Sequence, residues 1–124
     1  MFGKKNKDVV LMHYEGLQGF KQDFPCKVKL EDEAVVFTNN NGGSAKLPVS
    51  QIQSLDSMPE VNFMGKYHNN PVSTAKMGVK WFYVINYIAS SGEAKYIAFW
   101  GTDSATRKFY DELNAKVSSG TITL

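Results

Sequence analysis

The sequence has little of what metal-binding and phosphate-binding sites are usually built from. Cys26 is the only cysteine among 124 residues, which excludes an internal disulfide and fits a reducing compartment. His68 has no further histidine, cysteine or carboxylate ligand at the short spacing of a metal site. The pair Gly42-Gly43 lacks the Lys-Ser/Thr and the helix that a phosphate-binding loop requires. We therefore expect no metal ion and no cofactor.

The remaining candidate catalytic groups have structural explanations. His13 lies in a stretch that reads as a strand, and the local sequence positions no serine or cysteine nucleophile for it, so a structural histidine is favoured over a general base. Cys26 alternates with apolar residues, which is typical of a buried thiol. The acidic run 31–33 is explained by a charged turn. The sequence therefore predicts a protein that is not an enzyme.

Basic charge is concentrated at the start of the chain. The formal net charge is +2, and the lysines Lys4, Lys5 and Lys7 all lie in the first seven residues. Without them the chain is nearly neutral, which argues against a nucleic-acid-binding face. Firm electrostatic anchoring to a membrane usually takes more basic residues or a lipid. A solvated terminus is therefore favoured, and these three lysines are the candidate lipid-binding residues of the alternative hypothesis.

Long apolar runs are absent as well. The run at 9–12 is too short for the apolar region of a signal peptide. No segment approaches the length that a bilayer-spanning helix needs. The sequence therefore predicts a cytoplasmic protein.

The chain is rich in β-strand patterning. Aromatic residues make up 13% of it, and most lie in runs typical of strands. An apolar stripe at Phe109, Leu113 and Val117 predicts one C-terminal helix that begins near residues 102–104. Alternating or apolar runs bounded by turn residues predict strands at 9–17, 26–31, 34–38, 44–47, 51–55, 79–89 and 93–100.

The segment 56–78 is the irregular part of the chain, with two prolines, two glycines and no sustained periodicity. It is expected to be a long loop, within which 61–64 could form a short strand. The chain then divides into a flexible basic tail (1–8), a single domain (9–118) and a C-terminal tail (119–124). The predicted fold is mainly β (α+β): a bent antiparallel barrel or sandwich of about six or seven strands, capped by one C-terminal α-helix.

Three blocks of sequence carry a resemblance to a known family. They are FPCKVKLEDEAVVF (Phe24–Phe37), KLPVSQIQSL (Lys46–Leu55), and YVINYIASSGEAKYIAF (Tyr83–Phe99) with the helix ATRKFYDEL behind it. In this order they resemble the pleckstrin-homology (PH) superfold, and more closely an uncharacterised group of bacterial PH-like domains. The resemblance implies a PH-like fold but no particular activity. The segment 62–78 departs from the family pattern because it lacks the hydrophobic, glycine-rich insert often found there.

The resemblance suggests a lipid ligand, which the residues support weakly. Lipid-binding PH domains use a basic cluster in the loop between the first two strands. The matching loop here, 16–27, holds only Lys21 and Lys27, offset by Asp23. Little charge is therefore present for phosphate recognition. Peripheral binding to a membrane or a lipid headgroup, through the basic N-terminus and this loop, is the alternative hypothesis.

The main hypothesis is a non-enzymatic interaction module on a PH-like scaffold. Its expected partner is another protein or a second copy of the chain, because open sheet edges can pair between chains and bacterial PH-like domains as a class form oligomers. Aromatic and methionine side chains are enriched at protein interfaces. The candidate contact residues are Phe20, Lys21 and Phe24 in the first-strand loop, and Phe63, Met64, Tyr67 and His68 in the long loop.

Overall fold

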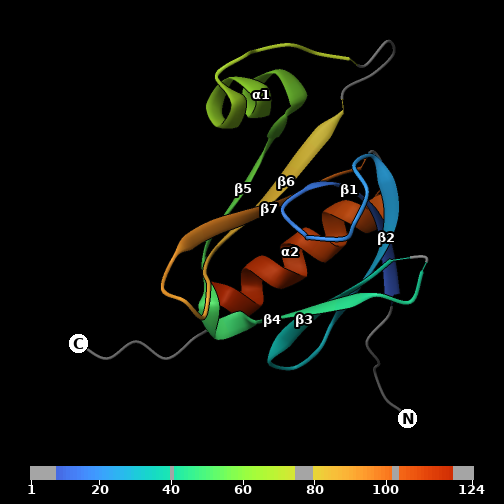
Figure 1. The fold of residues 1–124 in the computed structure, drawn as a ribbon, viewed down its shortest axis with the longest axis vertical. Helices are drawn as coiled ribbons and strands as arrows, with labels where there is room; N and C mark the ends of the chain where they lie inside the picture. The colour runs from blue at the N-terminus through green and yellow to red at the C-terminus, as the bar shows by residue number, and fades with distance from the viewer. Residues whose placement is uncertain (1–7, 40, 75–79, 102–103, 119–124) are drawn as a thin grey trace.

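The computed structural model describes residues 8–39, 41–74, 80–101 and 104–118. Within these ranges the chain is mainly β, with seven strands, two α-helices and one 3-10 helix (Figure 1). The helices are η1 (Val49–Gln51), α1 (Glu60–His68) and α2 (Ser104–Ser118). The strands are β1 (Asp8–Glu15), β2 (Phe24–Leu30), β3 (Ala34–Thr38), β4 (Ser44–Pro48), β5 (Ile52–Pro59), β6 (Trp81–Ile88) and β7 (Ala94–Gly101).

The seven strands form one antiparallel sheet in the order β4-β3-β2-β1-β7-β6-β5. The sheet bends strongly. This bend is shown by the rings of Phe37 on β3 and Phe99 on β7, which stack with centroids 5.3 Å apart although two strands lie between β3 and β7 in the sheet. Among the described strands, β4 and β5 are the two ends of the sheet and are not paired with each other. The seven predicted strands are confirmed, and the sheet forms an open, sandwich-like arrangement and no closed barrel.

The main core lies inside the bend of the sheet. Alternate residues of the strands point into it, as the period of two requires. The helix α2 adds Phe109 and Leu113, both buried, as its predicted apolar stripe indicates. Cys26 is also buried in this core, and burial raises the pKa of its thiol to about 11. The thiol therefore stays protonated at neutral pH, which supports the structural interpretation of this cysteine.

The predicted long loop at 56–78 is wrong over its first half. Strand β5 continues to Pro59, and α1 follows directly, so the short strand suggested at 61–64 is part of a helix. The local signals for this helix are a proline at its N-terminal boundary, an acidic residue in its first turn, and Asn69 in the left-handed conformation at its end. Residues 75–78 of the predicted loop lie outside the described residues.

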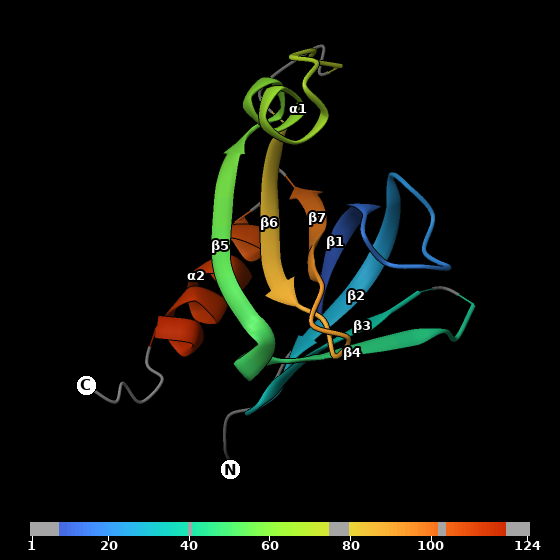
Figure 2. The same ribbon diagram turned by 60° about the vertical axis from the view of Figure 1, so that its left-hand side comes forward.

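Helix α1 covers a second, smaller core on the outer face of the sheet. Figure 2 shows α1 beside the end of β5 and the start of β6, away from α2. Phe63 stacks on Phe82 of β6 with centroids 4.4 Å apart, and both side chains have no exposed surface. Tyr14 of β1 meets both rings edge-on. Strand β6 is therefore buried on both faces, which explains why apolar residues occur at both parities of its sequence.

The buried carboxylate of Glu60 fixes the beginning of α1 to the segment that follows the helix. It accepts hydrogen bonds from the Thr74 main-chain N–H and hydroxyl, both at 2.8 Å, and from the Ser73 hydroxyl at 3.2 Å. The Lys80 ammonium lies 3.9 Å away. Although burial opposes ionisation, the Thr74 hydrogen bonds and the Lys80 charge together lower the pKa of Glu60. The charged form is thus stabilised in the folded protein.

We expect Glu60→Gln to lower the free energy of unfolding by about 1–2 kcal/mol at neutral pH, because the charged acceptor is lost. The folded-state pKa lies below the ordinary value of 4.5. The carboxylate therefore contributes its full stabilisation above pH 4.5, and this is lost as pH falls through the folded-state pKa. Urea unfolding of both proteins as a function of pH checks this. A difference between them that did not shrink in acid would contradict it.

Candidate binding site between two loops

His13 organises the loop that joins β1 and β2. Its side chain is buried at the end of β1, and both ring nitrogens meet main-chain groups of this loop. Nε2 accepts a hydrogen bond from the Leu17 N–H at 3.2 Å. The proton therefore sits on Nδ1, which lies 3.0 Å from the Lys21 carbonyl oxygen and donates to it. One imidazole ring thus spans the loop from residue 17 to residue 21.

The surroundings of His13 keep its ring neutral. Phe20 and Phe99 meet the imidazole edge-on, with ring centroids 5.7 and 5.9 Å away. Burial lowers the pKa of His13, and this outweighs the opposing hydrogen bond to the Lys21 carbonyl and the charge of Glu15. Because both nitrogens are engaged, the ring has no free position for proton transfer. The structural interpretation of His13 is therefore supported.

Two hydrogen bonds fix Asp23, at the C-terminal end of the same loop, one to β7 and one to β1. The Trp100 indole N–H donates to the Asp23 carboxylate at 2.8 Å, and the Asp23 main-chain N–H donates to the His13 carbonyl at 2.6 Å. At the other end of the loop, Gly16 has a φ of 113° and passes directly over the main chain of β7. The loop is therefore held at both of its ends, at Gly16 by its close approach to β7 and at Asp23 by these two hydrogen bonds.

Asn39 connects this loop to the turn between β3 and β4. Its side-chain oxygen accepts hydrogen bonds from the N–H groups of Asn41, at 2.9 Å, and Gly43, at 2.8 Å. Its amide nitrogen donates to the Gly19 carbonyl at 3.3 Å. Asn39 thus closes its own turn in the manner of an Asx-turn and joins two segments that are 20 residues apart in the sequence.

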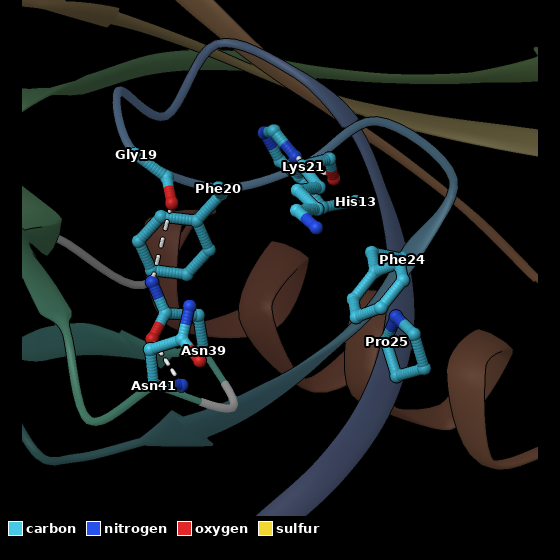
Figure 3. Close-up of a pocket in the computed structure, with 8 residues that line it drawn as sticks. All are labelled: His13, Gly19, Phe20, Lys21, Phe24, Pro25, Asn39 and Asn41. Atoms are coloured by element: carbon cyan, nitrogen blue, oxygen red, sulfur yellow. Dashed lines mark hydrogen bonds between the residues drawn. The ribbon is translucent and has the colours of Figure 1, made fainter.

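A cavity of about 160 Å³ lies between these two loops. We call it the loop pocket, and Figure 3 shows the side chains that surround it. The Lys21 ammonium lies 5.3 Å from the centre of the Phe24 ring. Among the described residues that line the pocket, Lys21 is the only one with a side-chain charge at neutral pH, given a neutral His13. The lining residues are His13, Gly19, Phe20, Lys21, Phe24, Pro25, Asn39 and Asn41.

The loop pocket combines two aromatic walls with one cation and amide groups at its rim. The three predicted contact residues of the first-strand loop, Phe20, Lys21 and Phe24, all line it. Asn39 and Asn41 were not among the predicted contact residues, because the asparagine-rich segment reads as an ordinary turn. The role of His13 in supporting the pocket was not predicted either, since a contact between a strand and a loop leaves no local pattern in the sequence.

The candidates from the predicted long loop have different positions. Phe63 and Met64 are buried in the second core, so the structure removes them from the candidate contact residues. Tyr67 stacks on Phe63, and its hydroxyl donates to the Asp56 carboxylate at 2.7 Å. His68 is exposed, but its Nε2 lies 2.8 Å from the Glu15 carboxylate. Both Tyr67 and His68 thus attach α1 to the sheet.

The residues of the membrane hypothesis, Lys4, Lys5 and Lys7, lie outside the described residues. In the described part of the chain, no helix has both the length and the apolar character to cross a membrane. The same part contains no group of three or more histidine, cysteine, aspartate or glutamate side chains arranged to hold a metal ion.

Comparison with known proteins finds no match to this chain, either among protein-family models or among curated proteins.

Proposed function

We propose that this chain is a non-catalytic interaction module on a PH-like scaffold, and that it associates with a second copy through the loop pocket. The strand order supports the PH-like assignment: two meanders, β1–β4 and β5–β7, are followed by the C-terminal helix α2. The observation that carries the function is an exposed phenyl ring beside a pocket of phenyl size. Phe24 is 43% exposed at the rim of this pocket.

The dimensions and chemistry of the pocket favour an aromatic side chain. Its volume of about 160 Å³ is close to the roughly 150 Å³ of an engineered apolar cavity that binds benzene. The ring of Phe20 forms one wall, and the Lys21 ammonium, which lies 5.3 Å from the centre of the Phe24 ring of its own chain, is the cation of the pocket. In a pair of identical copies, Phe24 of each copy can enter the pocket of the other, which is the reciprocal arrangement of a two-fold dimer.

A lipid headgroup fits the same pocket less well. Phosphate groups are recognised by several cations or by bidentate arginine, and the loop pocket offers Lys21 alone. An exposed aromatic ring beside a single lysine is more typical of a protein interface, where aromatic residues are enriched.

The proposal predicts a dimer that depends on Phe24. Sedimentation velocity of the wild type over a range of concentrations should show reversible dimerisation, and Phe24→Ser should abolish it. Val61→Ser is the matched control, because Val61 is an apolar side chain with the same exposed fraction of 43%, on α1. A wild type that stays monomeric at the highest concentration, or a dimer that persists in Phe24→Ser, would refute the proposal.

A further inference from the structure

A second cavity, of about 420 Å³, lies at the mouth of the bent sheet. We call it the mouth cavity. Buried residues of the main core form its floor, namely Phe37, Leu47 and Ile97. The end of β6 and the turn after it supply the opposite wall, with Tyr87 and Ser90. This volume lies in the range of pockets that bind ligands, roughly 300–1,000 Å³.

The mouth cavity runs along the edge of β4. Four consecutive residues of this strand line it: Ala45, Lys46, Leu47 and Pro48. Successive side chains of a strand point to opposite faces. A cavity that only covered one face of β4 would therefore meet every second residue. Contact with all four shows that the cavity lies beside the strand, where its main-chain groups emerge.

The main-chain groups on this side of β4 are not used by the sheet. β4 is an end strand, with β3 as its one neighbour among the described strands. The Asn39 N–H donates to the Gly43 carbonyl, and the Val49 N–H donates to the Glu33 carbonyl. Hydrogen-bonded pairs alternate with non-bonded pairs along an antiparallel ladder. Between these two bonds, the alternation directs the main-chain groups of Lys46 away from β3.

We propose that an extended segment of a partner protein, with apolar side chains at every second position, binds here as an added strand on β4. Its main chain would pair with the free groups of β4, and its alternate side chains would enter the mouth cavity. The cavity has nearly three times the roughly 150 Å³ of a cavity that binds benzene, so it can hold two such side chains. The free ladder groups favour a peptide over an acyl chain, which has no hydrogen bonds to offer.

The site is separate from the loop pocket. The mouth cavity and the loop pocket have no lining residue in common. The wall opposite β4 is held in place by the Gln51 side chain, whose amide donates to the Ile88 carbonyl at 3.0 Å. The inference therefore does not depend on the proposed dimerisation, and Phe24→Ser should leave peptide binding unchanged.

The test is a selection of displayed random peptides on the full chain, followed by affinity measurements on protein variants. Lys46→Pro removes the outward N–H, whereas Lys46→Ala keeps it. Ser90→Tyr narrows the cavity from its rim, and Ser50→Tyr is its control, because Ser50 is exposed and does not line the cavity.

Selected peptides should share alternating apolar residues. Lys46→Pro and Ser90→Tyr should each weaken binding by about tenfold or more, the effect of one lost hydrogen bond to the ladder or of a blocked side-chain position.

A second set of affinity measurements changes the peptide and leaves the protein as the wild type. Methylation of the peptide N–H that faces β4 should weaken binding to the wild type about tenfold, and methylation of the neighbouring N–H should have a smaller effect. The proposal is wrong if selection yields no peptide with alternating apolar residues. It is also wrong if binding survives both Lys46→Pro and the ladder-facing methylation, even when Ser90→Tyr abolishes it, because the ligand would then fill the cavity without pairing with the strand.

Discussion

Replacement of Phe82 by alanine is expected to lower the free energy of unfolding by about 3–5 kcal/mol, because the change leaves a cavity in a closely packed region. Phe82 has no exposed surface and stacks on Phe63 at 4.4 Å, while Tyr14 meets it edge-on at 5.2 Å. Its ring is the one in β6 on which Phe63 of α1 stacks. Since small proteins are stable by only about 5–15 kcal/mol, this loss should be evident as a large fall in the urea midpoint.

Phe24→Ala provides the matched comparison, because it removes the same side chain from an exposed position. Its effect on stability should be within about 1 kcal/mol, since Phe24 is 43% exposed and its removal leaves no enclosed cavity. Hydrogen exchange of the α1 amides gives a second measurement: protection of the helix should fall in Phe82→Ala and remain in Phe24→Ala. Equal effects of the two substitutions would mean that the second core contributes little to stability.

Gly16→Ala is expected to destabilise the protein by about 3 kcal/mol or more, since it combines a strained backbone with a main-chain clash. The φ of Gly16 is 113°, a region that residues with a Cβ rarely adopt. An added Cβ would lie 2.7 Å from the Ile97 Cα and even closer to the Tyr96 carbonyl oxygen. Both obstacles belong to the main chain of β7, so no side-chain rotation can relieve them. Thermal unfolding of the variant measures the loss.

Gly92→Ala separates the two causes. Gly92 also has a positive φ, of 92°, but an added Cβ there would meet no atom within 4 Å. Gly92→Ala should therefore cost only the backbone term, about 1–2 kcal/mol. If the two alanine variants were equally stable, the close approach of Gly16 to β7 would have no energetic importance.

The sequence predicts the strands well because their pattern is local. Each hairpin is marked by alternation and by turn residues, and α2 by its apolar stripe. Helix α1 was missed for a physical reason. It is nine residues long, so a pattern of period 3.6 barely repeats, and Pro59 and Asn69 read equally well as loop residues. The apolar residues on both faces of β6 did indicate a further element, because a second apolar face must be covered by another part of the chain.

The candidate site could be predicted only in part, for the same kind of reason. The composition of the first-strand loop selected Phe20, Lys21 and Phe24, all of which line the loop pocket. Their apposition to the β3–β4 turn depends on Asn39, whose hydrogen bond to the Gly19 carbonyl joins distant parts of the chain. Phe63 and Met64 have the composition of an interface but are buried. Composition identifies residues able to bind and cannot distinguish an interface from a core.

The pairing of β1 with β7 has a consequence for folding kinetics. Every other pair of neighbouring strands in the sheet is also consecutive in the sequence. The two meanders can therefore form from nearby residues, each at a small cost in loop-closure entropy. Joining β1 to β7 brings together segments more than 80 residues apart, and the register pair of Met12 with Trp100 is 88 residues apart. Because non-local contacts slow folding, the pairing of β1 with β7 is expected to form last and to set the rate at which the whole domain folds.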